Sequence, residues 1–415
     1  MKNNPQKTLN GEVHNWYKIA LGYSDQLVKS MLTKFDLKAG SWVLDPFCGS
    51  GTTLVECKKQ GVNSLGIDAN PSSYFAARVK TNWSPNPQKI KDLASIVEDR
   101  YSSMMNKHAG YKRDKTYEYL CSSGMIERGW ISEKPLIKSI YLKKAIQELN
   151  ASNSDKNLLL LALIDEVLND ASNVKFGPQL YCGASKKDAN VLKGFLARVD
   201  KISEDLKIVK KLPEGHVKIY EGDARLCNAI IDVNPDAPIT GVICSPPYPG
   251  EHDYTRHARL ELAFLEAVTD KESLRRVKHQ MIRSNTKGIY KGDNDRDLVK
   301  ENALLACIVE KIDLKARDKT HGFARLYSTV VLEYFGGMKR HLQNLHGMLP
   351  SGAQCAYVVG DQSSYLQVYI PTATILSEIV YETGFGFVEI IPWRTSWASK
   401  TSRKVEENIL VFRKL

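Results

Sequence analysis

The chain has 415 residues, which gives room for two or three domains, and its formal net charge is +11. A basic excess of this size suggests a polyanionic partner such as nucleic acid. The eight cysteines form no CxxC pair and no cluster with histidine, so we expect reduced cysteines and no metal site. Met1–Val13 lacks an apolar signal region, and the longest apolar run, Leu158–Ile164, is too short to span a bilayer. We therefore expect a cytoplasmic protein without a membrane partner.

The first predicted elements surround a glycine-rich turn. Ser24 is a suitable N-cap for a helix from Asp25 to about Phe35. A short strand, Ser41–Leu44, then runs into Asp45–Thr53, which reads Asp-Pro-Phe-Cys-Gly-Ser-Gly-Thr-Thr. The two glycines of this turn permit a tight bend and a close approach of the backbone to a ligand.

The elements after the turn complete a βαβ unit. The predicted helix Thr52–Lys59 has its amino terminus directed at the same ligand. A second strand, Ser64–Ile67, ends in Asp68, and an acidic residue about 20 residues after a glycine-rich turn is placed to bind ribose hydroxyls. The pattern is not the GxGxxG of dinucleotide binders, so it predicts a site for a nucleoside.

The stretch from 85 to 212 interrupts the alternation of strands and helices. It is rich in lysine and has helical periodicity, most clearly at Leu158–Leu168 and Val191–Leu206. We predict a helical insertion at 85–212 between two parts of one α/β domain, a nucleoside-binding half at 1–84 and a second half at 213–415. The insertion either contacts nucleic acid or only supports the fold.

The second half contains an abruptly ended strand. Val217–Tyr220 is a predicted strand followed by Asp223, and Gly241–Cys244 is the next one. Pro246 and Pro247 each fix φ and remove a donor, so this strand must end at about Ser245 with a stiff turn beyond its carboxyl edge. The turn, Ser-Pro-Pro-Tyr, joins a hydroxyl, carbonyls without competing amides and an aromatic ring. It suits a flat base with an amino group, although a turn that only packs a core tyrosine remains an alternative.

Basic side chains gather in three later places: just after this turn, in a segment near 271–320, and in the loop Trp393–Arg403. We expect the segment near 271–320 to recognise a nucleic-acid target. Mixed basic and amide side chains in polar segments suit contacts to a nucleic-acid backbone. We expect such contacts from Arg256, Arg259, Arg283, Lys287, Arg394 and Lys400. A solvated surface is the alternative for the 271–300 part.

The rest of the chain predicts a closing sheet edge. A long amphipathic helix is expected at His321–Leu345, a strand at Ala353–Val359 and a helix at Thr372–Thr383. Phe387–Ile391 and Asn408–Phe412 predict a final pair of strands.

Two of these motifs resemble those of one enzyme family. Asp45–Thr53 resembles motif I of the amino-methylating DNA methyltransferases, which bind S-adenosylmethionine, and Gly66–Pro71 resembles the motif after it. Ser245–Tyr248 resembles the catalytic motif, in the form often found in N4-cytosine enzymes. His14–Leu32 resembles the helix that closes the cofactor pocket. The resemblance implies an α/β fold: a Rossmann-like, mostly parallel methyltransferase sheet with a terminal antiparallel strand and a mostly helical insertion. It assigns cofactor binding to Asp45, Pro46, Phe47, Cys48, Gly49, Gly51, Thr52, Asp68 and Asp223.

The same resemblance implies a function. Its catalytic residues are Ser245, Pro246, Pro247 and Tyr248, with hydrogen bonds to the N4 amine of a flipped cytosine and Tyr248 stacked on the base. The expected substrate is double-stranded DNA with a specific recognition site, in a bacterial or archaeal restriction-modification or related defence system. A cognate restriction endonuclease is a candidate partner.

Three alternatives stay open: methylation of adenine N6, methylation of RNA, and a DNA-binding module without activity. A carbon-5 cytosine mechanism is rejected, because Cys244 does not stand in the Pro-Cys arrangement that it needs.

Overall fold

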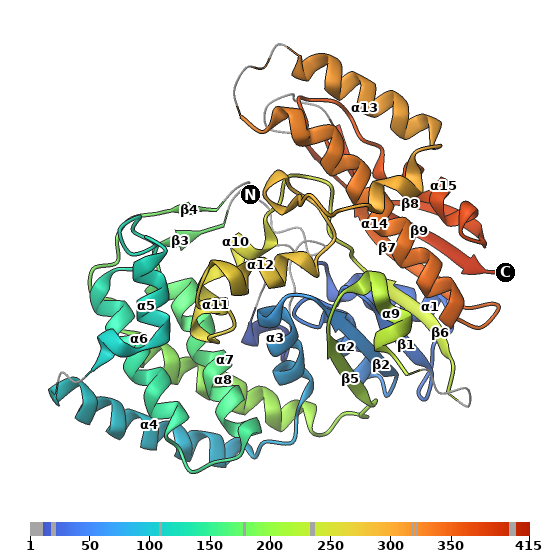
Figure 1. The fold of residues 1–415 in the computed structure, drawn as a ribbon. Helices are drawn as coiled ribbons and strands as arrows, with labels where there is room; N and C mark the ends of the chain where they lie inside the picture. Colours follow the sequence, from blue (N-terminus) through green and yellow to red (C-terminus); the bar gives the residue numbers. More distant parts are fainter. Residues whose placement is uncertain are drawn as a thin grey trace.

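The structure is a computed structural model that describes residues 11–17, 22–107, 110–176, 180–232, 237–317, 319, 322–397 and 404–415. Its centre is a twisted sheet with helices on both faces, and a largely helical lobe stands beside the sheet (Figure 1). The described chain thus has the α/β architecture with a mostly helical insertion that the sequence predicts.

The sheet has the strand order β5-β2-β1-β6-β7-β9-β8. Neighbours from β5 to β7 are parallel, whereas β9 is antiparallel to both β7 and β8. The mostly parallel sheet with a terminal antiparallel strand is therefore confirmed. The strands are β1 (Trp42–Asp45), β2 (Asn63–Asp68), β5 (Val217–Glu221), β6 (Ile239–Cys244), β7 (Gln354–Gly360), β8 (Phe385–Trp397) and β9 (Lys404–Lys414).

Side chains that alternate along the strands build two cores, one on each face of the sheet. On one face, Val43 and Ile243 pack in a cluster with residues of the first helix. On the other face, Leu44 and Val242 pack in a cluster with the long helix near the carboxyl terminus. Because successive strand residues point to opposite faces, these apolar runs are buried on both sides, as in doubly wound sheets.

Helices cover both faces of the sheet. One side carries α1 (Asp25–Lys34), α2 (Thr52–Lys59) and α3 (Pro71–Thr81), which contact one another in series. The other side carries α9 (Cys227–Ile230), α14 (Tyr327–Met348) and α15 (Thr372–Glu382). Ser24 caps α1 by accepting a hydrogen bond from the Gln26 amide at 3.2 Å, as its sequence position predicts.

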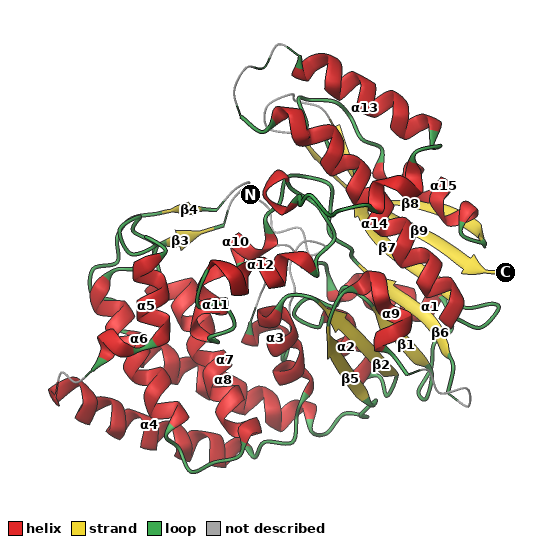
Figure 2. Cartoon of the chain, viewed as in Figure 1, coloured by secondary structure: helices red, strands yellow, loops and turns green. Residues whose placement is uncertain are grey.

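The insertion after α3 forms a lobe with its own apolar core (Figure 2). Residues outside the insertion, including Tyr17, Ala76 and Leu260, join that core, so the lobe is packed against the rest of the chain. Its elements are α4 (Pro87–Lys107), α5 (Lys115–Ser122), α6 (Glu133–Gln147), α7 (Asn153–Glu166), α8 (Val191–Val209) and a short hairpin of β3 (Val174–Lys175) and β4 (Tyr181–Cys182).

The connection from β6 to β7 carries further helices above the sheet edge: α10 (Tyr254–His257), α11 (Arg259–Phe264), α12 (Lys271–His279) and α13 (Ala303–Ala316). Single turns of other helical types complete the described chain: η2 (His14–Trp16), η3 (Tyr111–Arg113), η4 (Val167–Ala171), η5 (Ala224–Leu226), η6 (Thr286–Gly288), η7 (Asp295–Val299) and η8 (Ala324–Leu326).

The carboxyl-terminal hairpin differs from its prediction. Trp393–Trp397, predicted as loop, is part of β8, because the ladder with β9 continues as far as the pair Trp397 and Lys404. The basic loop predicted at Trp393–Arg403 is thus partly a strand, and residues 398–403 lie outside the described residues.

Candidate active site

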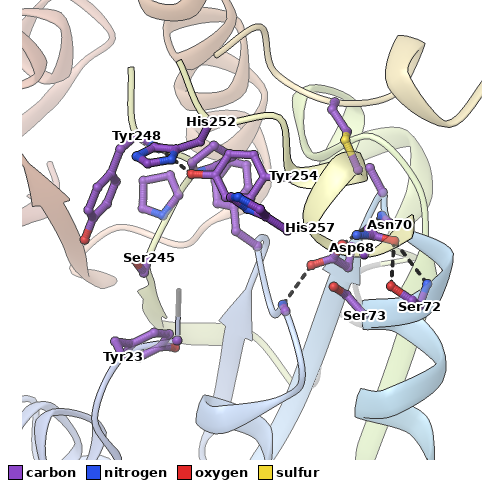
Figure 3. A pocket seen from close by; sticks show the side chains of 18 of the residues that line it. Tyr23, Asp68, Asn70, Ser72, Ser73, Ser245, Tyr248, His252, Tyr254 and His257 are labelled. Carbon is purple, nitrogen blue, oxygen red and sulfur yellow. Dashed lines mark hydrogen bonds between the residues drawn. The ribbon is translucent and has the colours of Figure 1, made fainter. Parts of the chain in front are cut away.

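A cavity of about 500 Å³ lies at the carboxyl ends of the parallel strands β1, β2 and β6. Phe47 and Gly49 enter its wall after β1, Asp68 at the end of β2, and Ser245 after β6. Asp68 and Ser245 stand on different sides of the space, with Tyr254 and His257 drawn between them (Figure 3). Parallel α/β sheets bind ligands at this edge, and the volume suits a nucleoside-sized molecule.

The glycine-rich turn is shaped by backbone conformations that glycine adopts readily. Gly49 has φ +52° and Gly51 has φ +86°. A Cβ on Gly51 would meet the Cα of Ala77 at 3.2 Å, so helix α3 also limits the space at this position. The turn can therefore lie close against α3 and begin α2 without a side chain in the way.

Asp68 is tied to this turn by its carboxylate. Oδ2 accepts the Gly49 amide at 2.8 Å, and Oδ1 accepts the Asn70 amide at 2.8 Å. Burial raises the pKa of Asp68 to about 6, against the lowering effect of those two amides. Each oxygen keeps a further lone pair for a ligand in the cavity. The sequence placed Asp68 correctly at the strand end beside the turn.

Asp45 has a structural position beneath the turn. Its side chain is fully buried; Oδ2 accepts the Tyr23 hydroxyl at 2.9 Å and Oδ1 the Phe47 amide at 3.0 Å. Burial raises the pKa of Asp45 to about 7. Five predicted cofactor residues do not line the described cavity: Asp45, Cys48, Gly51, Thr52 and Asp223. Pro46, Phe47, Gly49 and Asp68 do line it.

The Ser-Pro-Pro-Tyr turn is fixed by hydrogen bonds at three points. The Ser245 hydroxyl donates to the Val358 carbonyl of β7 at 3.3 Å. The Pro247 carbonyl accepts the Tyr334 hydroxyl at 2.8 Å. The amide of Tyr248 donates to the hydroxyl of Tyr254 at 3.0 Å. All four residues of the turn line the cavity, so the structure brings them together with Asp68.

The ring of Tyr248 is anchored by the final hairpin. Its hydroxyl donates to Glu407 Oε1 of β9 at 2.5 Å, and Arg394 Nη2 of β8 donates to the same oxygen at 2.9 Å. Both Arg394 and Glu407 line the cavity. Arg394, predicted to contact nucleic acid, thus stands beside the Ser-Pro-Pro-Tyr turn and is paired there with a carboxylate.

Asp223, predicted to bind the cofactor, is paired with a neighbouring guanidinium. The Arg225 guanidinium holds both of its carboxylate oxygens, at 3.0 Å and 2.6 Å, while the neighbouring Ala224 lines the cavity. The structure therefore leaves the Asp223 carboxylate outside the described cavity wall.

Arg283 contradicts the expected contact with nucleic acid. It is 4% exposed, pairs with Asp293 at 2.7 Å and 2.9 Å, and donates to the carbonyls of Lys278 and Met281. A guanidinium enclosed in this way holds its own loop together. Arg256 and Lys287 are exposed, and Arg259 is half-buried against Thr255. Lys400 lies outside the described residues.

The cavity also contains residues that the sequence did not single out, notably Tyr17, Asn70, His252 and Glu261. Glu261 stands between Leu260 and Leu262 in helix α11 and is 4% exposed. Burial raises its pKa to about 7. An isolated acid within such an apolar helical stretch was the available signal for a buried functional group.

Comparisons with known proteins agree with this geometry. A family profile described as "DNA methylase" and named N6_N4_Mtase matches residues 11–78, which include the glycine-rich turn and Asp68. The Type II methyltransferase M.BsoBI of Geobacillus stearothermophilus is 28% identical over 67% of this chain and 57% of its own length. M.AvaI of Nostoc sp. is 22% identical over 91% of this chain and 80% of its own length. M.MjaII of Methanocaldococcus jannaschii is 30% identical over 36% of this chain and 31% of its own length.

In the part of the chain that the structure describes, every helix is too short or too polar to cross a membrane. The profile match covers the glycine-rich turn and Asp68 of the cavity, and the longer alignments extend the similarity over more of the chain. Over these ranges the chain is similar to the amino-methylating DNA methyltransferases, a family whose methyl donor is S-adenosylmethionine.

Proposed function

We propose that the protein is a site-specific DNA methyltransferase that methylates the exocyclic N4 amine of a flipped cytosine. The observation that carries the proposal is that one cavity joins the Asp68–Gly49 pair to the Ser-Pro-Pro-Tyr turn. The first is a nucleoside-binding arrangement, and the second offers acceptors to an amine. A methyl donor and a base held side by side gain most of their acceleration from being positioned.

The residues at the strand ends fit S-adenosylmethionine, which supplies an electrophilic methyl group on its sulfonium. Asp68 would accept hydrogen bonds from the ribose hydroxyls, since its two amide contacts leave lone pairs on both oxygens. The positive φ of Gly49 brings the backbone close to that position without a Cβ. Phe47, Ala69 and Ile282 provide apolar wall on either side.

Ser245 would accept a hydrogen bond from the amine. Its hydroxyl donates to the Val358 carbonyl, and the oxygen would accept an N–H from the target base. Pro246 lies in the cavity wall and brings a second acceptor in its carbonyl. Two acceptors on one amino group favour a pyramidal nitrogen whose lone pair is no longer delocalised into the ring. The methylated ammonium loses its proton readily, so a strong base is not required.

Entry of the base would use the aromatic side of the cavity. Tyr248 would stack on the flipped base, a contact that any base can make because each has an aromatic face. Phe176 of the insertion also lines the cavity and is 40% exposed, so we propose that the lobe at 85–212 meets the DNA beside the flipped nucleotide. The exposed Arg256 and Lys287 would contact phosphates. A cognate restriction endonuclease and a role in a restriction-modification system belong to the same proposal.

The product of the reaction tests the proposal. The protein is incubated with S-adenosylmethionine and duplex DNA, transfer RNA or ribosomal RNA, and the products are digested to nucleosides and analysed by mass spectrometry. We expect N4-methylcytosine in DNA and none with Ser245→Ala. N6-methyladenine alone would overturn the cytosine assignment, and methylation confined to RNA would overturn the DNA substrate.

A further inference from the structure

One carboxylate in the cavity has an oxygen without a partner. Glu261 Oε1 accepts the Tyr17 hydroxyl at 3.0 Å, whereas Oε2 is buried and has no hydrogen-bond partner among the described residues. A buried polar atom left in this state is costly, and a buried charge more so. The arrangement is therefore incomplete as it stands, and the cavity that Glu261 lines is where a partner can enter.

The other acids near the cavity are already engaged. Asp68 accepts two amides, and Glu407 accepts Tyr248 and Arg394 at Oε1 while its Oε2 forms an ion pair with Arg394 Nε. Asp45 is fully enclosed and holds Tyr23. Of the carboxylates that line the described cavity, Glu261 has the oxygen that is left for a cationic ligand.

Glu261 also faces the cavity from the side of the glycine-rich turn. The carbonyl of Tyr17 accepts Lys80 Nζ at 3.3 Å, and the same Nζ donates to the Ser50 hydroxyl within the turn at 3.5 Å. Helix α11 packs against α3, whose first residues line the cavity. The Ser-Pro-Pro-Tyr turn has different neighbours from Glu261, because it is held by β7, β9 and Tyr334.

We infer that the Glu261 carboxylate binds the α-ammonium group of the amino-acid part of S-adenosylmethionine. The inference rests on the proposed function, because it names a ligand contact within that cofactor site. An ammonium brings three donors and a charge opposite to the carboxylate, and charge-assisted hydrogen bonds are the stronger kind. The Tyr17 hydroxyl fixes the carboxylate so that Oε2 is presented to the ligand. A neutral amide could hold Tyr17 equally well, so that contact alone does not account for an acid here.

Two cofactor fragments test this assignment by calorimetric titration. S-adenosylhomocysteine carries the ammonium, and 5′-methylthioadenosine has the same nucleoside without the amino-acid part. Glu261→Gln keeps the acceptor for Tyr17 and removes the charge. We expect it to weaken S-adenosylhomocysteine binding by about 10- to 100-fold, the range for a charged hydrogen bond, and to change 5′-methylthioadenosine binding by less than about twofold.

The controls separate this contact from a general effect on folding. Glu118→Gln removes an exposed glutamate from α5 and should leave both affinities unchanged. An equal loss for both fragments, or no loss for either, would overturn the assignment of Glu261 to the ammonium. If the wild-type protein binds neither fragment, the proposed function falls and this inference falls with it. If it binds both and only the Glu261→Gln comparison fails, the inference alone is wrong.

Discussion

The hydroxyl of Tyr248 lies 2.5 Å from the carboxylate of Glu407, so the last residue of the Ser-Pro-Pro-Tyr turn is held from a strand 159 residues later in the chain. Arg394 of the neighbouring strand donates to the same carboxylate. The antiparallel edge of the sheet therefore sets how the aromatic ring stands in the cavity. Strands β8 and β9 therefore shape one wall of the cavity as well as closing the fold.

Substitutions at Tyr248 should separate its ring from its hydroxyl. Tyr248→Ala removes a stacking surface, a loss of about 1–3 kcal/mol for a base. Tyr248→Phe keeps the surface and loses the bond to Glu407, so we expect a smaller fall in kcat/KM on duplex DNA. Glu407→Gln keeps an acceptor for the hydroxyl, so we expect its loss to be no larger than that of Tyr248→Phe. Equal losses in Tyr248→Phe and Tyr248→Ala would show that the ring contributes nothing, and affinity for S-adenosylhomocysteine serves as the control.

Arg283 and Lys287 should behave differently when each is changed to alanine. Arg283→Ala leaves Asp293 without its buried partner, a change that commonly costs about 3–5 kcal/mol of stability. Lys287 is exposed, so Lys287→Ala should leave stability within about 0.5 kcal/mol. If Lys287 contacts one phosphate, its loss should reduce the slope of log affinity for DNA against log salt by about 0.9. Urea unfolding and DNA binding at several salt concentrations measure the two effects.

An unchanged salt slope in Lys287→Ala would make that side chain part of a solvated surface. A stable Arg283→Ala protein with weakened DNA binding would restore the original prediction for Arg283. Arg256→Ala, at another exposed position after the catalytic turn, provides the matched comparison for Lys287.

The difference between these two basic residues shows where sequence reasoning stopped. Glycines, prolines and the ends of parallel strands are signals that the local sequence carries. They were sufficient to predict a common site for Gly49, Asp68 and Ser245, and the structure brings these three residues into one cavity. The partners of charged residues are set by tertiary packing. Arg283 meets Asp293 in the folded loop, and Asp223 meets Arg225, which withdraws both from their predicted contacts.

The hairpin edge was underestimated for a similar reason. Trp393–Trp397 contains polar and basic residues and lacks a strong strand pattern, yet pairing with β9 extends the strand through it. The apolar neighbours of Glu261 in the sequence predict that it is buried. Its position beside Tyr17 depends on the packing of two segments that the insertion separates in the sequence.

Cofactor affinity should depend on the ionisation of Asp68. Its pKa is raised to about 6, so its carboxylate becomes charged, and a better acceptor for ribose hydroxyls, between about pH 5 and 7. Binding of 5′-methylthioadenosine, which has the ribose and no ammonium, should tighten over that range in the wild-type protein. Asp68→Asn should bind with little pH dependence, and Asp68→Ala should lose about 1–3 kcal/mol. Unchanged affinity in a folded Asp68→Ala protein would remove Asp68 from the cofactor site.

The buried carboxylate of Glu261 should lower the free energy of unfolding of the ligand-free protein when it is ionised. Burial raises the pKa of this group to about 7 from an ordinary value of 4.5, so the folded state holds its proton more tightly than the unfolded state. The protonated form therefore favours folding at low pH, and this contribution is lost as pH rises from about 4.5 to about 7. Glu261→Gln cannot ionise, so its free energy of unfolding should exceed that of the wild type increasingly across this window. Above about pH 7 the gain should level off on the order of 3 kcal/mol, before any cost of the substitution.

Asp45 and Asp68 remain in both proteins, so their titration cancels in the comparison. Urea unfolding at a series of pH values measures the difference. A difference between the two proteins that stays constant with pH would mean that Glu261 ionises freely in the folded state and is not the enclosed acid that an ammonium ligand would neutralise.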